Sequence, residues 1–115
     1  MKSKIILSLF LMLIFKVSNA QSNTNPQAVQ LAHKIAKKMK DSLDLSAQQR
    51  QQIYEVNMNL QNQKQDVRLQ NPPRDSLIAR IQRIETTRDG LYRPIIGEEK
   101  FTLYLQKKTN LVNNN

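Results

Sequence analysis

The residue types that carry out catalysis or bind metals are scarce in this 115-residue chain. It contains one histidine, His33, and no cysteine. A transition-metal site would therefore need carboxylates brought together by folding. A single histidine also leaves little from which to build an activated serine or threonine nucleophile. We predict that His33 is a surface residue and that the protein is not an enzyme and needs no cofactor or metal.

The carboxylates have simpler structural roles in this pattern. Asp41 and Asp44, and likewise Glu98 and Glu99, are close in sequence but fall at expected helix ends, where their charge interacts with the helix dipole. The chain has only two glycines, too few for a glycine-rich phosphate loop. The sequence thus favours a protein that acts by binding.

The N-terminus has the order of a secretory signal peptide. Lys2 and Lys4 precede an apolar run of 11 residues at 5–15, and the small residues Ser18 and Ala20 follow it. That run is shorter than the roughly 20 residues that span a bilayer as a helix. We predict cleavage after Ala20, which would release the mature protein into the periplasm.

The mature chain is small and basic. Cleavage would leave 15 Lys and Arg against 9 Asp and Glu, a net charge of +6. Since export keeps the protein away from nucleic acid, we expect acidic partners of the envelope, namely unfolded proteins or, through a weak contact, anionic membrane. The alternative is a solvated basic face that serves solubility. A secreted domain of this size usually relies on disulfides, and without cysteine we expect a homodimer instead.

Proline, glycine and capping residues predict an all-α domain of about four helices over residues 26–108. Residues 21–25 are expected to form a disordered leader and residues 109–115 a loose tail. Asn25 and Pro26 should begin the first helix, which should end at about Asp41 or Leu43. Its polar face carries four lysines and by itself could lie on an anionic membrane.

The strongest local signal opens the second helix. Ser46 can accept a backbone N–H of the first turn, while Gln49 reaches back to the N–H of Ser46, which makes a capping box. The helix should run to about Gln70. Its expected buried stripe is interrupted by Lys64 and consists of Ile53, Val56, Leu60 and Val67. The many Asn and Gln side chains around it, Asn57 among them, are predicted to be a solvated surface.

Asn71-Pro72-Pro73 should end this helix, because proline lacks an N–H and restrains the preceding residue. Asp75 or Ser76 is expected to cap a third helix that forms a long hairpin with the second and ends at Arg93-Pro94. Its apolar side comprises Leu77, Ile81, Ile84 and Leu91. A short last helix should begin at Glu98-Glu99.

The opening of the second helix resembles the Leu-Thr-x-x-Gln motif of the Spy/CpxP family of small periplasmic proteins. Leu45, Ser46 and Gln49 match the motif, and serine keeps the capping chemistry of threonine. The motif ordinarily appears twice, each time opening a helix.

The second copy of the motif would comprise Ile96, Gly97 and Lys100. It is degenerate, since Gly97 replaces the hydroxyl residue and Lys100 replaces glutamine. Its place at the start of the last helix still fits the family.

The resemblance implies an antiparallel dimer of bent helical hairpins that form a cradle. In the family, the concave face holds unfolded clients without ATP. Some members instead restrain a sensor kinase in the envelope stress response, and others bind zinc, which the single histidine disfavours here. We predict a chaperone-like periplasmic protein and keep two alternatives open, a regulatory partner of one envelope protein and a helical protein at anionic membrane. The candidate client-binding residues are Arg50, Met58, Arg68, Arg80 and Arg83.

Overall fold

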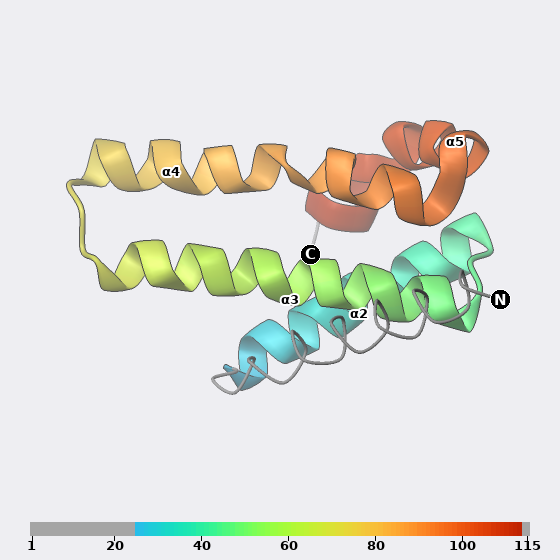
Figure 1. Ribbon diagram of the computed structural model, residues 1–115, viewed down its shortest axis with the longest axis horizontal. Coiled ribbons are helices and arrows are strands. Elements are labelled where there is room, and N and C mark those ends of the chain that lie inside the picture. Colours follow the sequence, from blue (N-terminus) through green and yellow to red (C-terminus); the bar gives the residue numbers. More distant parts are fainter. Residues whose placement is uncertain (1–24, 114–115) are drawn as a thin grey trace, which may run out of the picture.

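The computed structural model describes residues 25–113, and all of its secondary structure is helical (Figure 1). The expected all-α class is therefore confirmed for this part of the chain. The predicted signal peptide, leader residues 21–24 and the last two residues lie outside the described residues.

Helix α2 (Pro26–Leu43) begins and ends where the sequence predicts. The Asn25 side chain accepts a hydrogen bond from the Gln27 N–H at 2.9 Å, and proline occupies the first helical position. Asp44 then adopts a left-handed conformation with φ 56°, which turns the chain sharply into the next helix.

Helix α3 (Ala47–Leu69) runs antiparallel to α2 and is the longest helix in the described part of the chain (Figure 1). It ends before Asn71-Pro72-Pro73, as expected, and α4 (Arg74–Thr86) returns beside its second half. The predicted cap at Asp75 or Ser76 is wrong, because Pro73 is the N-cap residue and provides no side-chain hydrogen bond.

The expected end of the third helix at Arg93-Pro94 is also wrong. The helix breaks earlier, at Thr87, and α5 (Arg88–Lys108) continues through Pro94. Within α5 the non-helical residue is Gly97, with φ 85° and ψ 163°. Pro94 lies inside the helix and removes one backbone N–H, yet the helix continues past it. The conformation at Gly97 favours glycine and breaks the helical path.

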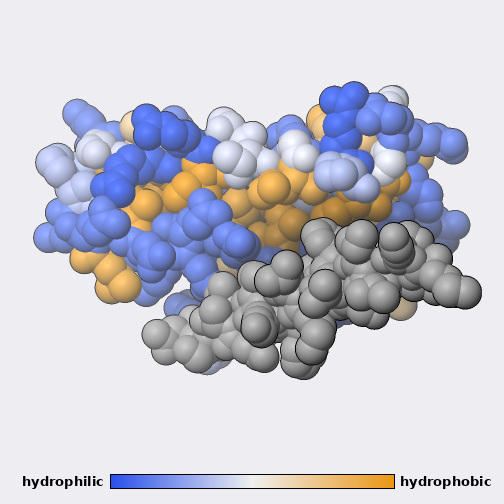
Figure 2. Space-filling model, viewed as in Figure 1, coloured by the Kyte–Doolittle hydropathy of each residue, from blue (hydrophilic) through white to orange (hydrophobic). Residues whose placement is uncertain are grey.

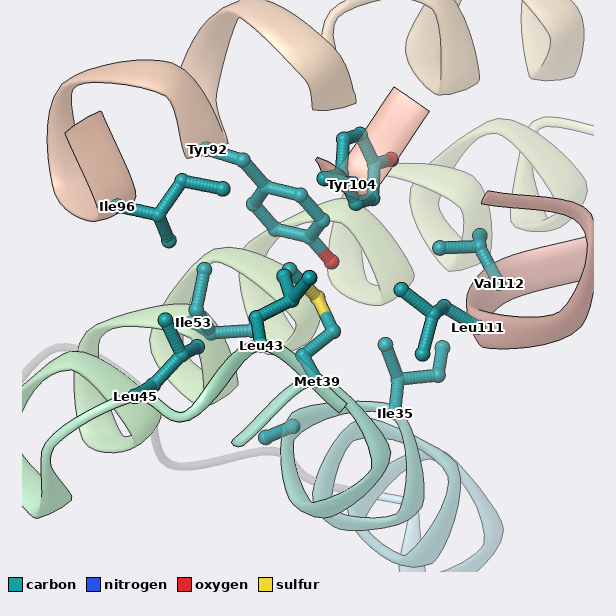
Figure 3. Close-up of a cluster of buried hydrophobic side chains, with 11 residues drawn as sticks. Ile35, Met39, Leu43, Leu45, Ile53, Tyr92, Ile96, Tyr104, Leu111 and Val112 are labelled. Carbon is teal, nitrogen blue, oxygen red and sulfur yellow. The ribbon is translucent and has the colours of Figure 1, made fainter. Parts of the chain in front are cut away.

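The expected loose tail is ordered over most of its length. Residues Thr109–Asn113 form a π-helix, η1. Leu111 and Val112 are buried in the same cluster as Ile35 and Met39 of α2 (Figure 3). Apolar burial of these two side chains explains why the polar residues around them do not keep this segment loose.

The core lies where α2, the first half of α3, α5 and η1 meet. Figure 3 shows Tyr92 and Tyr104 projecting into this cluster from α5, above Met39 and Leu43 of α2. The two tyrosine rings meet edge to face, with centroids 5.3 Å apart. In contrast, no residue of α4 is fully buried. On the apolar side expected for the third helix, Leu77, Ile81 and Ile84 are half-buried and Leu91 is exposed.

Candidate functional site

The two copies of the sequence motif lie against each other. Ser46 Oγ accepts from the Gln49 N–H at 3.1 Å, and Gln49 Oε1 accepts from the Ser46 N–H at 2.9 Å. The predicted capping box is therefore confirmed. The same Gln49 side chain donates from Nε2 to the Ile95 carbonyl at 3.1 Å, so it joins the start of α3 to the turn that precedes Gly97.

The second copy has structural roles that its degenerate sequence did not indicate. Ile96 is buried in one cluster with Leu45. Lys100 Nζ donates to the Asp44 carbonyl, and Lys107 Nζ donates to the Ser42 carbonyl at 3.2 Å. A cation at the last carbonyls of a helix is favourable. Lysine at position 100 thus stabilises the C-terminal end of α2.

A buried polar cluster joins α3 to α5. Arg88 is 2% exposed and Asn57 is 1% exposed. The Arg88 guanidinium donates from Nη1 to Asn57 Oδ1 at 2.9 Å and to the Tyr92 hydroxyl at 2.7 Å. Asn57 Nδ2 donates to the Ala32 carbonyl of α2 at 3.1 Å. Burial raises the pKa of Tyr92 to about 12, against an opposing effect of Arg88, so this phenol is neutral and acts as a hydrogen-bond partner.

The charge of Arg88 is balanced by Glu85, at the end of α4. Arg88 Nε and Nη2 donate to the two Glu85 oxygens at 3.2 and 2.8 Å. Lys64 of α3 forms an ion pair with the same carboxylate, and the Lys64 side chain is 12% exposed. Partial burial alone would raise the pKa of Glu85, but the hydrogen bonds from Arg88 and Lys64 outweigh it and lower the pKa to about 2.

Asp89 makes a second tie, between two segments of α5. Its carboxylate accepts from the Tyr104 hydroxyl at 2.8 Å and from Lys108 Nζ at 2.9 Å. Burial and the bond to Asp89 raise the pKa of Tyr104. Within residues 25–113, every buried side-chain nitrogen and oxygen has a hydrogen-bond partner. These groups are committed to one another, which is typical of a structural network.

This network was not predicted from the sequence, because Asn57 was assigned to the solvated face of α3. A usable signal was present in the spacing. Asn57 lies four residues after Ile53 and three before Leu60, which places it on the buried stripe. Arg88 and Tyr92 continue the four-residue steps from Ile84 to Ile96. Lys64 is also on the stripe of α3, and its partner Glu85 explains the interruption.

The second half of α3 and all of α4, residues 60–86, form a hairpin that we call the arm. It extends past the start of α2 (Figure 1). Leu69 at its tip is 72% exposed, and Ile78 of α4 is 43% exposed. Figure 2 shows apolar side chains in a band between polar flanks along the junction of α3 with α4 and α5. The arm therefore presents apolar surface that its own fold leaves uncovered.

The exposed charge of the arm is basic. Asp66 and Asp75 are its carboxylates apart from Glu85, which is paired with Lys64 and Arg88. Its basic groups outside that network are Arg68, Arg74, Arg80 and Arg83. The arm thus combines exposed apolar side chains with an excess of guanidinium groups.

Three of the five predicted client-binding residues lie on the arm. Arg68 and Arg83 are exposed, and Arg80 is half-buried and donates from Nη2 to Gln70 Oε1 at 2.8 Å. Arg50 lies in the first turn of α3, away from them, with Nη2 3.5 Å from Nδ1 of the exposed His33. Met58 is buried at 8% exposure, so its assignment to a binding surface is wrong. Met58 is adjacent to Asn57 in the chain, and both side chains are buried in the interior, where an apolar thioether is suited to packing.

Residues 25–113 contain no group of three or more histidine or acidic side chains placed to hold a metal ion. None of the helices in this range is long and apolar enough to cross a membrane. The chain was compared with protein-family models, curated proteins and solved structures, and no match was found in any of the three.

Proposed function

We propose that this protein is exported to the periplasm and binds unfolded or partly folded envelope proteins without ATP. The observation that carries the proposal is α4, a helix of 13 residues with four large aliphatic side chains and no buried residue. Leu77, Ile81 and Ile84 are half-buried and Ile78 is exposed, so each forgoes part of the roughly 1.5–3 kcal/mol that full burial of such a side chain contributes. A surface of this kind is typical of a site that another molecule covers.

The charge of the arm favours a client with acidic segments. Long-range attraction by the arginines would speed encounter, while the apolar band would hold the client through contacts that need no fixed sequence. A second copy of the chain is a poorer occupant of the same surface, because two basic arms would repel each other. The homodimer expected from the small size of the domain stays a prediction, which sedimentation at several concentrations would test.

The decisive experiment is suppression of aggregation in the absence of ATP. We expect the purified chain, at stoichiometric amounts, to slow light scattering by several unrelated denatured proteins, and to do so less well as salt increases. The double variant Leu69→Ser, Ile78→Ser should lose most of this activity. The matched control is Leu103→Ser, which changes an exposed leucine of α5 outside the arm and should keep it.

The second candidate is a regulatory protein that binds one envelope protein in the stress response. The fully paired buried network favours it, since such a network fixes one arrangement of the helices and hence one surface. In that case the chain would leave all aggregating clients unaffected, and crosslinking in the native cell would recover a single partner.

In the aggregation experiment, a loss of activity in Leu103→Ser equal to that of the arm variant would contradict binding at the arm.

Export is tested separately. We expect the protein from a periplasmic extract to begin at Gln21 and to have the mass of residues 21–115. A protein that retains residues 1–20 in the cytoplasmic fraction would overturn the proposed location while leaving the arm as the binding surface.

A further inference from the structure

The junction between α4 and α5 is built differently from the rest of the hairpin. The N–H of Thr87 bonds the Ile84 carbonyl at 3.1 Å, three residues back, and the hydroxyl of Thr87 bonds the same carbonyl at 2.7 Å. Thr86 makes the corresponding hydroxyl bond to the Arg83 carbonyl at 2.7 Å. Threonine hydroxyls that bond back to helical carbonyls weaken and bend helices. This turn is therefore a natural hinge.

Apolar burial changes abruptly at the hinge. Arg88, Tyr92 and Ile96 on its α5 side are buried, whereas no residue of α4 is. Leu77, Ile81 and Ile84 of α4 are only half-buried, so the attachment of α4 to the body of the molecule depends in part on charged ties. Glu85, three residues before Arg88, is the residue that carries them, since it binds Arg88 of α5 and Lys64 of α3 at once.

We infer that α4 is a hinged element held against α3 by a latch consisting of Glu85, Lys64 and Arg88. Release of the latch would let α4 turn about Thr86 and Thr87 while Arg88 stays anchored by Asn57 and Tyr92. The movement would expose the buried Leu60 and Val67 of α3 and enlarge the apolar band. The inference does not depend on what the arm binds, because it concerns the equilibrium of the chain alone.

Two features of the latch support opening of α4 as a unit. Loss of Glu85 leaves Arg88 with two partners inside the core, Asn57 and Tyr92, so the body keeps its main buried contacts. A further side-chain tie within the hairpin is the bond from Arg80 to Gln70, which is exposed and weak in water. Removing one carboxylate should therefore loosen α4 more than the rest of the molecule.

Hydrogen–deuterium exchange of the full chain, followed by mass spectrometry without any client, tests the latch. In Glu85→Gln we expect amides of α4 to exchange about tenfold faster than in the wild type, while those of α2 and α5 keep their rates. Lys64→Met removes one of the two cations that pair with Glu85 and keeps an apolar side chain of similar length. It should also speed exchange in α4. It serves as the second variant if Glu85→Gln folds poorly.

The matched control is Glu98→Gln. Glu98 pairs with Arg93 through two bonds of 2.6 Å on exposed surface of α5, so its loss should leave exchange in α4 unchanged. Unchanged α4 exchange in both latch variants would overturn the inference. Equal acceleration in α2, α3, α4 and α5 would also overturn it, because the chain would then open as one unit with no separate arm.

Discussion

The two halves of α3 are stabilised in different ways. The first half meets α2 and α5, and Ile53 there is fully buried among aromatic and aliphatic side chains. The second half meets α4, which has no buried residue. Both halves display an apolar stripe with a polar interruption, at Asn57 in the first and at Lys64 in the second.

The comparison shows how the same sequence pattern can lead to a core or to an exposed surface. Asn57 is enclosed because α2 and α5 both supply partners to it, and its side-chain oxygen and nitrogen are both paired. Lys64 has only α4 beside it and finds a single carboxylate. The number of neighbouring helices, more than the stripe itself, determines which half is rigid and which is available to a partner.

The largest expected effect comes from breaking the tie between the two halves. Arg88→Ala would remove the guanidinium that Glu85, Asn57 and Tyr92 share, and removal of one member of a buried charged pair costs about 3–5 kcal/mol in the free energy of unfolding. Urea denaturation followed by circular dichroism measures this loss. Arg83→Ala changes an exposed arginine of α4 and should shift the value by less than about 0.5 kcal/mol. Similar values for the two variants would mean that Arg88 does not join the halves.

The next effect concerns the bend in α5 that brings the two motif copies together. Gly97→Ala places a side chain at φ 85° and ψ 163°, a conformation that should cost about 1–3 kcal/mol. Gly90→Ala is the matched control, because it lies inside the helical part of α5 and should stabilise the protein by up to about 1 kcal/mol. A Cβ at either position meets no atom within 4 Å. The difference in unfolding free energy between them therefore isolates backbone strain, and equal values would contradict it.

Local signals in the sequence predicted the helical elements well where side chain and backbone interact within one turn. The caps at Asn25 and Ser46 and the stop at Asn71-Pro72-Pro73 are all found in the structure. Each depends on contacts between residues two to four apart, so the sequence alone contains the necessary information.

The errors concern residues whose environment depends on distant parts of the chain. Asn57 looks like its solvated neighbours until Arg88, 31 residues later, supplies a partner. Leu111 and Val112 look like part of a polar tail until α2 provides the surface that buries them. Lys100 departs from the motif and yet finds a carbonyl at the end of α2. For the same reason the sequence could not show which candidate binding residues share a surface. Three of them lie on the arm, Arg50 lies outside it, and Met58 is in the interior.

A smaller effect is expected from acid. The folded-state pKa of Glu85 is about 2, below its ordinary value of 4.5, so its contribution to stability is present above pH 4.5 and is lost as the pH falls toward 2. Because the carboxylate is about a third exposed, we expect the contribution to be about 1–2 kcal/mol after screening. Urea unfolding between about pH 6 and pH 3 should show a steeper loss in the wild type than in Glu85→Gln. Parallel curves for the two proteins would show that Glu85 is not held by the pair of cations.

The smallest expected effect is the difference in unfolding free energy between a substitution at the capped start of α3 and one at the uncapped start of α4. Ser46→Ala removes one half of the capping box and should lower the free energy of unfolding by about 1 kcal/mol. Ser76→Ala, in the exposed first turn of α4, has no hydrogen bond of this kind to lose and should be neutral within about 0.5 kcal/mol. Chemical denaturation of both variants makes the measurement. A loss in Ser76→Ala as large as that in Ser46→Ala would mean that the start of α4 is held as firmly as the core, and α4 could not then be the loosely attached half of the comparison.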